Sequence, residues 1–224
     1  MSSRRIPLAT GEIYHIFNRS IAREPIFHKS ADYQRFLEII DFYRFESPGL
    51  RFSFYNRLPV AQKNDFLISL YNSDDKLLKI FSFCLMPNHF HFLAKQIKED
   101  GIKKFVSQIE NSYAKYFDTK YERTGALFQA MFKAVRIETD EQLIHVIRYL
   151  HLNPLTAFLL KTVEENEMYP WSSYIDYLGQ RNLSFVDKEL FKSYFRTIEK
   201  IKSFTNDQAN YQRILSQIKH LLLE

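Results

Sequence analysis

The feature that most limits the possible folds is a run of β-forming residues from 77 to 95 that is interrupted only at Pro87-Asn88. A proline lacks the backbone N–H that a strand ladder needs, and it fixes a turn. The sequence therefore predicts two strands, at 77–86 and 90–95, joined by a short hinge. Strands joined by so short a connection pair in antiparallel fashion, which favours an antiparallel sheet.

The rest of the first 152 residues alternates between strand and helix patterns. Runs of β-forming residues predict strands at 12–18 and 132–137. Apolar residues at helical spacing predict helices, which we place at 30–46, 101–121 and 140–152.

The order strand, helix, strand, strand, helix, strand, helix is typical of a ferredoxin-like split βαβ arrangement. We therefore expect an α+β fold with an antiparallel sheet and helices on one face. The last of these helices is expected to end before Pro154, because a proline disfavours helical conformation in the residue that precedes it.

One internal segment, residues 47–76, stands outside this order. Its pattern predicts a short strand at 51–55 and a helix at 60–71. It is longer than the proposed fold requires, and its sequence assigns it no role.

The C-terminal part of the chain has a different pattern from the core. Beyond Trp171 the pattern is helical only, at about 187–203 and 206–223, after a linker at about 178–186. We therefore divide the chain into a catalytic core of residues 1–178 and a helical C-terminal extension of residues 179–224.

Composition gives expectations about partners and compartment. The 31 Lys and Arg against 26 Asp and Glu leave a net charge of +5, which suits a protein that binds a polyanion. The 21 Phe and 14 Tyr exceed what a core needs, so some could stack on unpaired bases, although an AT-rich genome would also explain them. The single Cys84, the lack of a secretory signal and the lack of a membrane-length apolar run predict a cytoplasmic protein without a membrane partner.

The first candidate chemistry lies in His89-Phe90-His91. Residues two apart in a strand point to the same face, so the two imidazoles stand side by side while Phe90 points into the core. Two imidazoles at this spacing can hold one divalent ion and leave its other positions open to substrate. A His-x-His pair alone is weak evidence, because most such pairs are surface or hydrogen-bonded core residues.

Several ordered motifs give this pair its context. They read Tyr14-His-Ile-Phe-Asn-Arg19, Met86-Pro-Asn-His-Phe-His91, Gly125-Ala-Leu-Phe-Gln129, Arg148-Tyr-Leu-His-Leu-Asn-Pro154 and Trp171-Ser-Ser-Tyr174. Over most of residues 12–174 the chain thereby resembles the HUH single-tyrosine transposases, particularly the REP-associated tyrosine transposases. The ordered set is far more specific than any one motif.

The resemblance implies roles for residues on the helix at 140–152 and beyond. In this family a tyrosine of the fourth motif is the nucleophile, which is Tyr149 here, and a Gln or Asn one turn later joins the metal, which is Asn153. Residues four apart share one helix face, so both side chains can reach one phosphate. His151 is the competing third ligand, and Tyr113 and Tyr116 are the alternative nucleophiles.

The activity that the resemblance implies is metal-dependent cleavage and transfer of single-stranded or hairpin DNA. His89 and His91 would bind Mg²⁺ or Mn²⁺, with Zn²⁺ as the alternative ion. Attack by Tyr149 would leave a 5′-phosphotyrosine and a free 3′-OH, so that a second end can be joined without a nucleotide cofactor. The strand must be single or extruded, because a duplex buries its bases.

Basic residues supply candidate contacts to this DNA. We expect Arg19, Arg123, Lys133 and Arg136 to bind it. Further candidates for phosphate contacts near the site are Lys95, Lys103, Lys104, Lys115 and Lys120. The family often has Arg where this chain has Met131, so one contact could be missing. For any one of these cations, a solvated helix face is the alternative.

Two other functions compete with this one. A domesticated DNA-binding protein that keeps the fold but no longer cuts is the main alternative, and the intact His89, His91, Tyr149 and Asn153 argue against it. A metalloenzyme that acts on small molecules fits less well, because the motifs include no Gly-rich phosphate loop and no paired carboxylates. The sequence leaves open whether the protein is a monomer or a homodimer.

Overall fold

The computed structural model describes residues 8–207 of the 224-residue chain. At its centre is an antiparallel sheet with the strand order β2-β3-β1-β4. The strands are β1 (Ile13–Arg19), β2 (Leu78–Met86), β3 (His89–Gln96) and β4 (Lys133–Ile137). The hairpin predicted at Pro87-Asn88 is present as β2 and β3, and the α+β fold class is confirmed.

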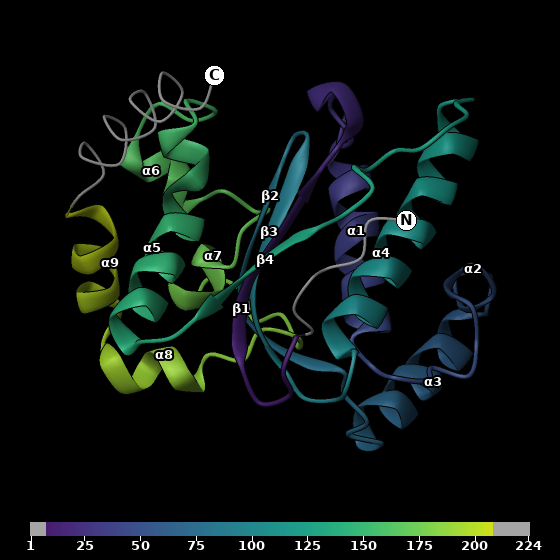
Figure 1. Cartoon of the computed structure of the whole chain (residues 1–224), viewed down its shortest axis with the longest axis horizontal. Coiled ribbons are helices and arrows are strands. Elements are labelled where there is room, and N and C mark those ends of the chain that lie inside the picture. Colours follow the sequence, from purple (N-terminus) through teal and green to yellow (C-terminus); the bar gives the residue numbers. More distant parts are fainter. Residues whose placement is uncertain (1–7, 208–224) are drawn as a thin grey trace.

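Helices cover both faces of this sheet (Figure 1). The helices α1 (Ser30–Tyr43) and α4 (Gly101–Lys120) pack on one face, and α5 (Asp140–Thr156) packs on the other. The expectation of helices on one face is therefore wrong. The physical reason lies in β3, whose residues 90–94 are all buried, because a strand buries successive residues only when both faces of the sheet are covered.

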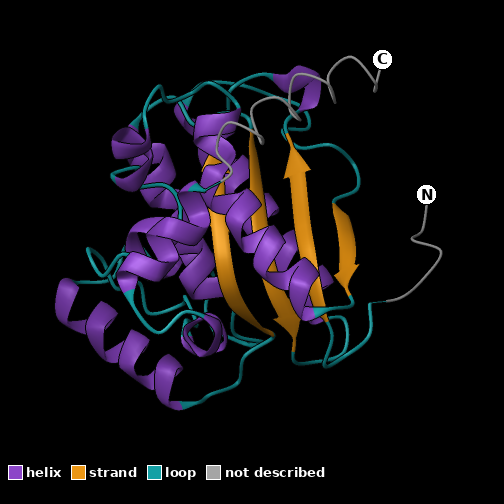
Figure 2. Cartoon of the chain, turned by 90° about the vertical axis from the view of Figure 1, so that its left-hand side faces the viewer, coloured by secondary structure: helices purple, strands orange, loops and turns teal. Residues whose placement is uncertain are grey.

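The two faces of β3 carry different side chains. Phe90 and Phe92 point toward α1 and α4, where their ring centroids lie 5.5 Å from Phe36 and 5.6 Å from Phe105. His91 points toward α5, where its ring centroid lies 5.8 Å from that of Tyr149, and His89 is beside it with ring centroids 4.9 Å apart. In Figure 2, the helices on this side of the sheet lie in front of the strands. One face is thus an aromatic core, and the other carries the imidazoles.

The segment between α1 and β2 is helical in two places, α2 (Phe52–Tyr55) and α3 (Val60–Asn72). The helix predicted at 60–71 is confirmed. The short strand predicted at 51–55 is wrong, because Phe52 packs against Phe42 at the end of α1, with ring centroids 5.3 Å apart, instead of joining the sheet.

Helix α5 runs through Pro154 to Thr156, so the predicted end before this proline is also wrong. The hydroxyl of Thr139 caps the start of the helix by accepting a hydrogen bond from the Gln142 amide at 3.1 Å. Pro154 lies in the last turn, where it removes only one helical hydrogen bond. The carbonyl of Asn153 still accepts from Ala157 at 2.9 Å, which keeps Asn153 on the helix.

Between α5 and residue 207 the chain forms four short helices. They are α6 (Val163–Glu167), α7 (Tyr174–Tyr177), α8 (Glu189–Tyr194) and α9 (Ile198–Asn206). The single helix predicted at 187–203 is thus divided into α8 and α9, and the one predicted at 206–223 lies outside the described residues but for its first two. No helix of the described range is long and apolar enough to cross a membrane.

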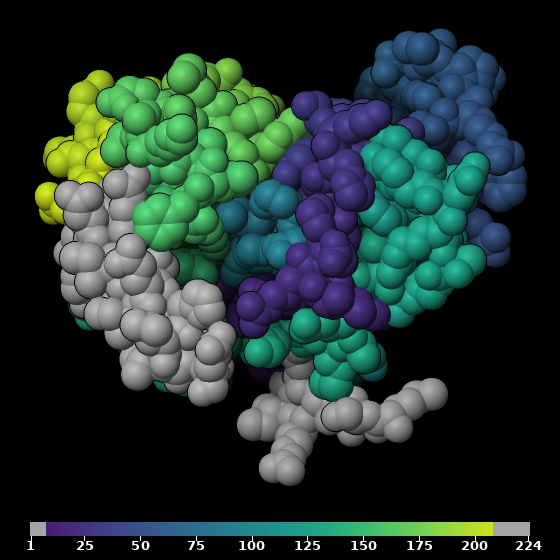
Figure 3. All heavy atoms as spheres, turned by 90° about the horizontal axis from the view of Figure 1, so that it is seen from above, coloured from purple at the N-terminus to yellow at the C-terminus, as the bar shows by residue number. Residues whose placement is uncertain are grey.

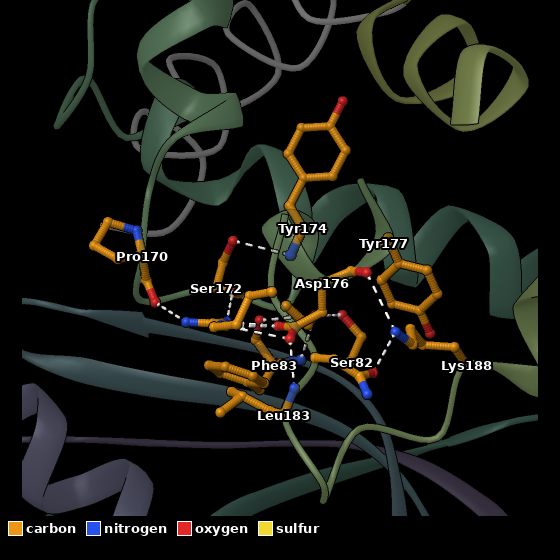
Figure 4. A network of polar contacts seen from close by, with 12 residues as sticks. Ser82, Phe83, Pro170, Ser172, Tyr174, Asp176, Tyr177, Leu183 and Lys188 are labelled. Carbon is orange, nitrogen blue, oxygen red and sulfur yellow. Dashed lines mark hydrogen bonds and ion pairs between the residues drawn. The ribbon is translucent and has the colours of Figure 1, made fainter. Parts of the chain in front are cut away.

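The segment predicted as a linker, 178–186, is tied to the core. Around Asp176, the guanidinium of Arg181 donates to the carboxylate, and the Leu183 amide donates to it at 2.8 Å (Figure 4). Val186 forms an isolated bridge with Ile80 of β2. The described part of the C-terminal extension therefore packs against the core. The domain boundary at residue 178 stays a prediction.

Candidate active site

The two imidazoles of β3 stand side by side on the sheet face that α5 covers. The ring centroids of His89 and His91 are 4.9 Å apart. Their register partners on β1 are Arg19 and Phe17. His89 lies at the start of β3, so the pair is at the end of the sheet where β1 stops and 3₁₀ helix η1 (Ile21–Arg23) begins. Seen from above in Figure 3, the N-terminal residues around η1 (purple) lie between α4 (teal) and the C-terminal helices (green).

A third histidine, which the sequence analysis did not single out, joins this pair. His15 Nε2 lies 3.0 Å from His91 Nδ1, and the two rings stack with centroids 5.2 Å apart. A signal for His15 was present in the first motif, because alternation along Tyr14-His-Ile-Phe17 puts His15 and Phe17 on one face. This contact orients the ring of His91 and leaves its Nε2 for a ligand.

Both imidazoles of β3 are held neutral. Burial lowers the pKa of His89 to about 4, and the positive charge of Arg19 acts in the same direction. Burial, followed by the charges of His89, His15 and Arg19, lowers the pKa of His91 well below its usual value. Since His89 Nδ1 lies 2.6 Å from Asn88 Oδ1, its proton is on Nδ1 and its Nε2 carries the lone pair.

Tyr149 approaches the histidines from α5. Its ring centroid is 5.8 Å from that of His91 and 5.9 Å from that of His15, and it meets both rings edge-on. Burial, with a smaller effect from Cys84, raises the pKa of the Tyr149 phenol, and a hydrogen bond with Asn153 and the charge of Arg19 partly offset this rise. The phenol is therefore protonated at neutral pH, so it needs a nearby cation to become a nucleophile.

The competing third ligand, His151, points elsewhere. It is fully buried, with its Nε2 3.2 Å from the Ser82 hydroxyl and 3.1 Å from the Ser173 hydroxyl. Its ring stacks on Tyr174, with centroids 5.0 Å apart. His151 thus belongs to the packing between α5, β2 and α7, whereas Asn153 lies close enough to Tyr149 to lower the pKa of its phenol.

The alternative nucleophiles lie on α4, on the opposite face of the sheet. The hydroxyl of Tyr113 donates to the Ile26 carbonyl at 2.5 Å, and the hydroxyl of Tyr116 donates to Asp32 at 2.9 Å. Neither side chain faces His89 and His91.

A pocket of about 680 Å³ opens onto the histidines. Among the described residues, its lining consists of His15, Phe17, Asn18, Arg19, Arg23, His89, His91, Gln129, Lys133, Val135 and Tyr149. Three of these side chains are cations and none is a carboxylate. The pocket therefore attracts an anion.

Of the four cations that we expected to bind DNA, the pocket contains Arg19 and Lys133. The other two lie outside it and have partners within the protein. Arg136 forms an ion pair with Glu12 at 2.8 Å, and Arg123 donates to the Ala126 carbonyl at 2.8 Å. Arg23 is the pocket cation that the sequence analysis missed.

The side-chain amide of Asn18 and the backbone amide of Gln129 fix the chain beside the pocket. Asn18 Nδ2 donates to the Gln129 carbonyl at 3.0 Å and to Glu110 Oε1 at 2.7 Å. The Gln129 amide in turn donates to the Arg19 carbonyl at 2.9 Å. These contacts join Asn18 and Arg19, at the end of the first motif, to Gln129, at the end of the third.

The residues present fit a divalent ion at an open site. The described residues contain no group of three His, Cys, Asp or Glu side chains that could hold a metal by themselves. His89 and His91 supply two neutral imidazoles, each with its Nδ1 engaged by a neighbour, which is the usual surrounding of a metal-binding histidine. Such a site leaves its remaining positions to an amide oxygen, water or substrate oxygens.

Comparison with known proteins relates this geometry to a family. Residues 65–153 match the family model described as "Transposase IS200 like". This range contains both histidines of β3, Tyr149 and Asn153. The resemblance to the tyrosine transposases is confirmed.

The fold supports the same conclusion. A solved structure of a REP-associated tyrosine transposase bound to a REP hairpin is similar, with a TM-score of 0.50 and 14% sequence identity over 84% of this chain and 98% of that one. At this identity, the likeness to that transposase concerns the fold. Among curated proteins, none matches the sequence. Together, the family match and the fold support a function related to DNA transposition.

Proposed function

We propose that this protein cleaves and joins DNA strands in a metal-dependent reaction with Tyr149 as the nucleophile. The observation that carries the proposal is the position of the Tyr149 ring, edge-on to His91 and His15, in a pocket lined by cations. A tyrosine that only packs between a helix and a sheet would not need to face two histidines in a pocket lined by cations.

His89 and His91 would hold a divalent ion, with Asn153 as the third ligand, and Mg²⁺ or Mn²⁺ suits this donor set. When bound, such an ion supplies the positive charge that polarises a phosphate and favours the phenolate. The protein's own part is to fix the ligands. Asn88 orients His89, and His15 orients His91.

In the proposed step, the Tyr149 oxygen attacks the phosphorus of the scissile phosphodiester after loss of its proton. The P–O3′ bond breaks, and the leaving oxygen takes up a proton to become a 3′-OH. The products are a 5′-phosphotyrosine and a free 3′ end, and the energy of the broken bond is kept in the tyrosyl ester. Arg19, Arg23 and Lys133 would hold the phosphates on either side.

We propose single-stranded or hairpin DNA as the substrate. Tyr149 is half-buried, so its target phosphate must enter the pocket, which a strand in a regular duplex cannot readily do. The similar solved structure is bound to a hairpin, which supports the same class of DNA here.

The test is incubation of the protein with labelled hairpin oligonucleotides and Mn²⁺. We expect a covalent adduct, mapped to Tyr149 by mass spectrometry, and none in Tyr149→Phe, which loses only one oxygen. Cleavage by Tyr149→Phe without an adduct would indicate attack by metal-activated water and reject the proposal. Hairpin binding without any cleavage by the wild type would identify the protein as a non-cleaving DNA-binding protein.

A further inference from the structure

A second, larger groove lies on the other side of the molecule. We call it the α1–α4 groove. Its volume is about 1020 Å³, and it is formed by one side of α1, one side of α4 and residues 46–57. Figure 1 shows α4, α2 and α3 on the face of the sheet opposite to α5. DNA bound in this groove therefore cannot be the segment that reaches Tyr149.

The groove carries a net positive charge. Its five cations come from three parts of the chain and are Arg35, Arg51, Arg57, Lys115 and Lys120. Its only carboxylate among the described residues is Glu46, whose charge is already paired with Lys98 and with Lys104 at 2.9 Å. These two ammonium groups, through hydrogen bonds, lower the pKa of Glu46 to about 2.

Three of the five cations have no partner among the residues that the structure describes. Lys120 is paired with Asp32 at 2.6 Å, and Arg35 is paired with Glu38 at 3.3 Å. Arg51, Arg57 and Lys115 are exposed and make no side-chain hydrogen bond or ion pair with any residue between 8 and 207. Three unpaired charges at one groove repel each other, so an anion that binds there is stabilised.

The groove also offers rings and amides, which distinguish a strand of nucleic acid from a simple anion. The half-buried Tyr116 ring lines the groove, with the Arg35 guanidinium 5.3 Å from its centre. The amide side chains of Asn56 and Asn111 are exposed in the same groove. Aromatic faces stack on bases and amides bond to base edges, whereas an acidic peptide needs neither.

We propose that the α1–α4 groove binds a second segment of single-stranded DNA, away from the segment that is cut. This inference rests on the proposed function, since that function supplies the DNA. It also gives the segment 47–76 a role, because this segment supplies Arg51, Arg57 and Phe52 to one wall of the groove. The strand's phosphates would contact Arg51, Arg57 and Lys115, and its bases would lie toward Tyr116 and Asn111.

The test measures DNA binding in a protein that cannot cut, so that it does not depend on the cleavage assay. In a Tyr149→Phe background, Arg57→Ala with Lys115→Ala is compared with the matched pair Arg196→Ala with Lys200→Ala, which removes the same charges from exposed positions around the start of α9. The probe is a fluorescent single strand long enough to reach beyond the active-site pocket, and anisotropy is followed across a salt series.

We expect the groove variant to bind this strand about tenfold more weakly. A plot of the logarithm of the binding constant against the logarithm of the salt concentration has a negative slope, and the groove variant should make this slope shallower by about 1.4. This is about 0.7 for each of two lost phosphate contacts, while the matched pair should change the slope little. A photoreactive strand should also crosslink to the peptide that contains Tyr116. Equal loss in both variants, or no loss in either, would overturn the proposal. A groove variant that binds DNA normally but loses affinity for polyglutamate would overturn it in favour of an acidic protein partner.

Discussion

His15 Nε2 lies 3.0 Å from His91 Nδ1, so a residue of β1 orients a proposed metal ligand of β3. The two side chains meet because the register of the sheet pairs Phe17 with His91 and puts His15 diagonally across from it on the same face. This contact has a consequence for metal binding that can be measured apart from catalysis.

We predict that His15→Ala lowers the affinity for Mn²⁺ by about 10- to 100-fold, because the neighbour that orients a metal-binding histidine is lost. Isothermal titration calorimetry without DNA measures this directly. His15→Gln keeps a side chain that can hydrogen-bond to His91, so it should recover much of the affinity. Equal affinity in wild type and His15→Ala would show that His15 only packs against the ring.

The proposed ligands have a test of their own. His89→Ala combined with His91→Ala should abolish Mn²⁺ binding and DNA cleavage while leaving the fold largely intact, because the aromatic core lies on the opposite face of β3. Calorimetry measures metal binding, and circular dichroism monitors whether the fold is kept. A double variant that binds the ion as tightly as the wild type would remove both histidines from the metal site.

Asn153 and His151 should differ in what their loss changes. Asn153→Ala should reduce cleavage moderately, because water can replace one amide ligand at a cost in metal affinity. His151→Ala should instead destabilise the fold by about 2–4 kcal/mol, since it opens a cavity and leaves the hydroxyls of Ser82 and Ser173 short of a partner. Urea denaturation and specific activity, measured on the same preparations, separate the two effects. Loss of metal binding in a stable His151→Ala protein would reverse the assignment.

Sequence reasoning succeeded where the determining interactions are local. The hinge at Pro87-Asn88 follows from the chemistry of one proline, and the common face of His89 and His91 follows from alternation along one strand. The position of Asn153 relative to Tyr149 follows from helix geometry, although the helix had to continue into Pro154 for it to hold.

What the sequence could not predict depends on how distant segments pack. His15 reaches His91 only through the register of β1 against β3, which no local pattern encodes. The side of the sheet taken by α5 depends on the path of the chain after β4, so helices on both faces were not anticipated. Likewise, Arg51 and Lys115 are far apart in sequence, and only the packing of α1 against α4 brings them to one groove.

The last prediction concerns Glu110, the carboxylate beneath the pocket that accepts a hydrogen bond from Asn18. Burial raises the pKa of Glu110 to about 7, and the bond from Asn18 offsets only part of this rise. Because the folded-state pKa lies above the unfolded value of 4.5, the ionised form is disfavoured in the fold, and stability falls as pH rises from about 4.5 to about 7.

Glu110→Gln keeps an oxygen for Asn18 and removes the charge, so it should stabilise the protein at pH 8, by up to about 3 kcal/mol, and have little effect at pH 4. Chemical denaturation at both pH values checks this, with Glu99→Gln, at an exposed position two residues before the same helix, as the control. If Glu110→Gln were equally destabilising at both pH values, the carboxylate would be ionised and needed by Asn18 throughout. Its role would then be to hold the Arg19–Gln129 backbone in place rather than to carry a buried proton.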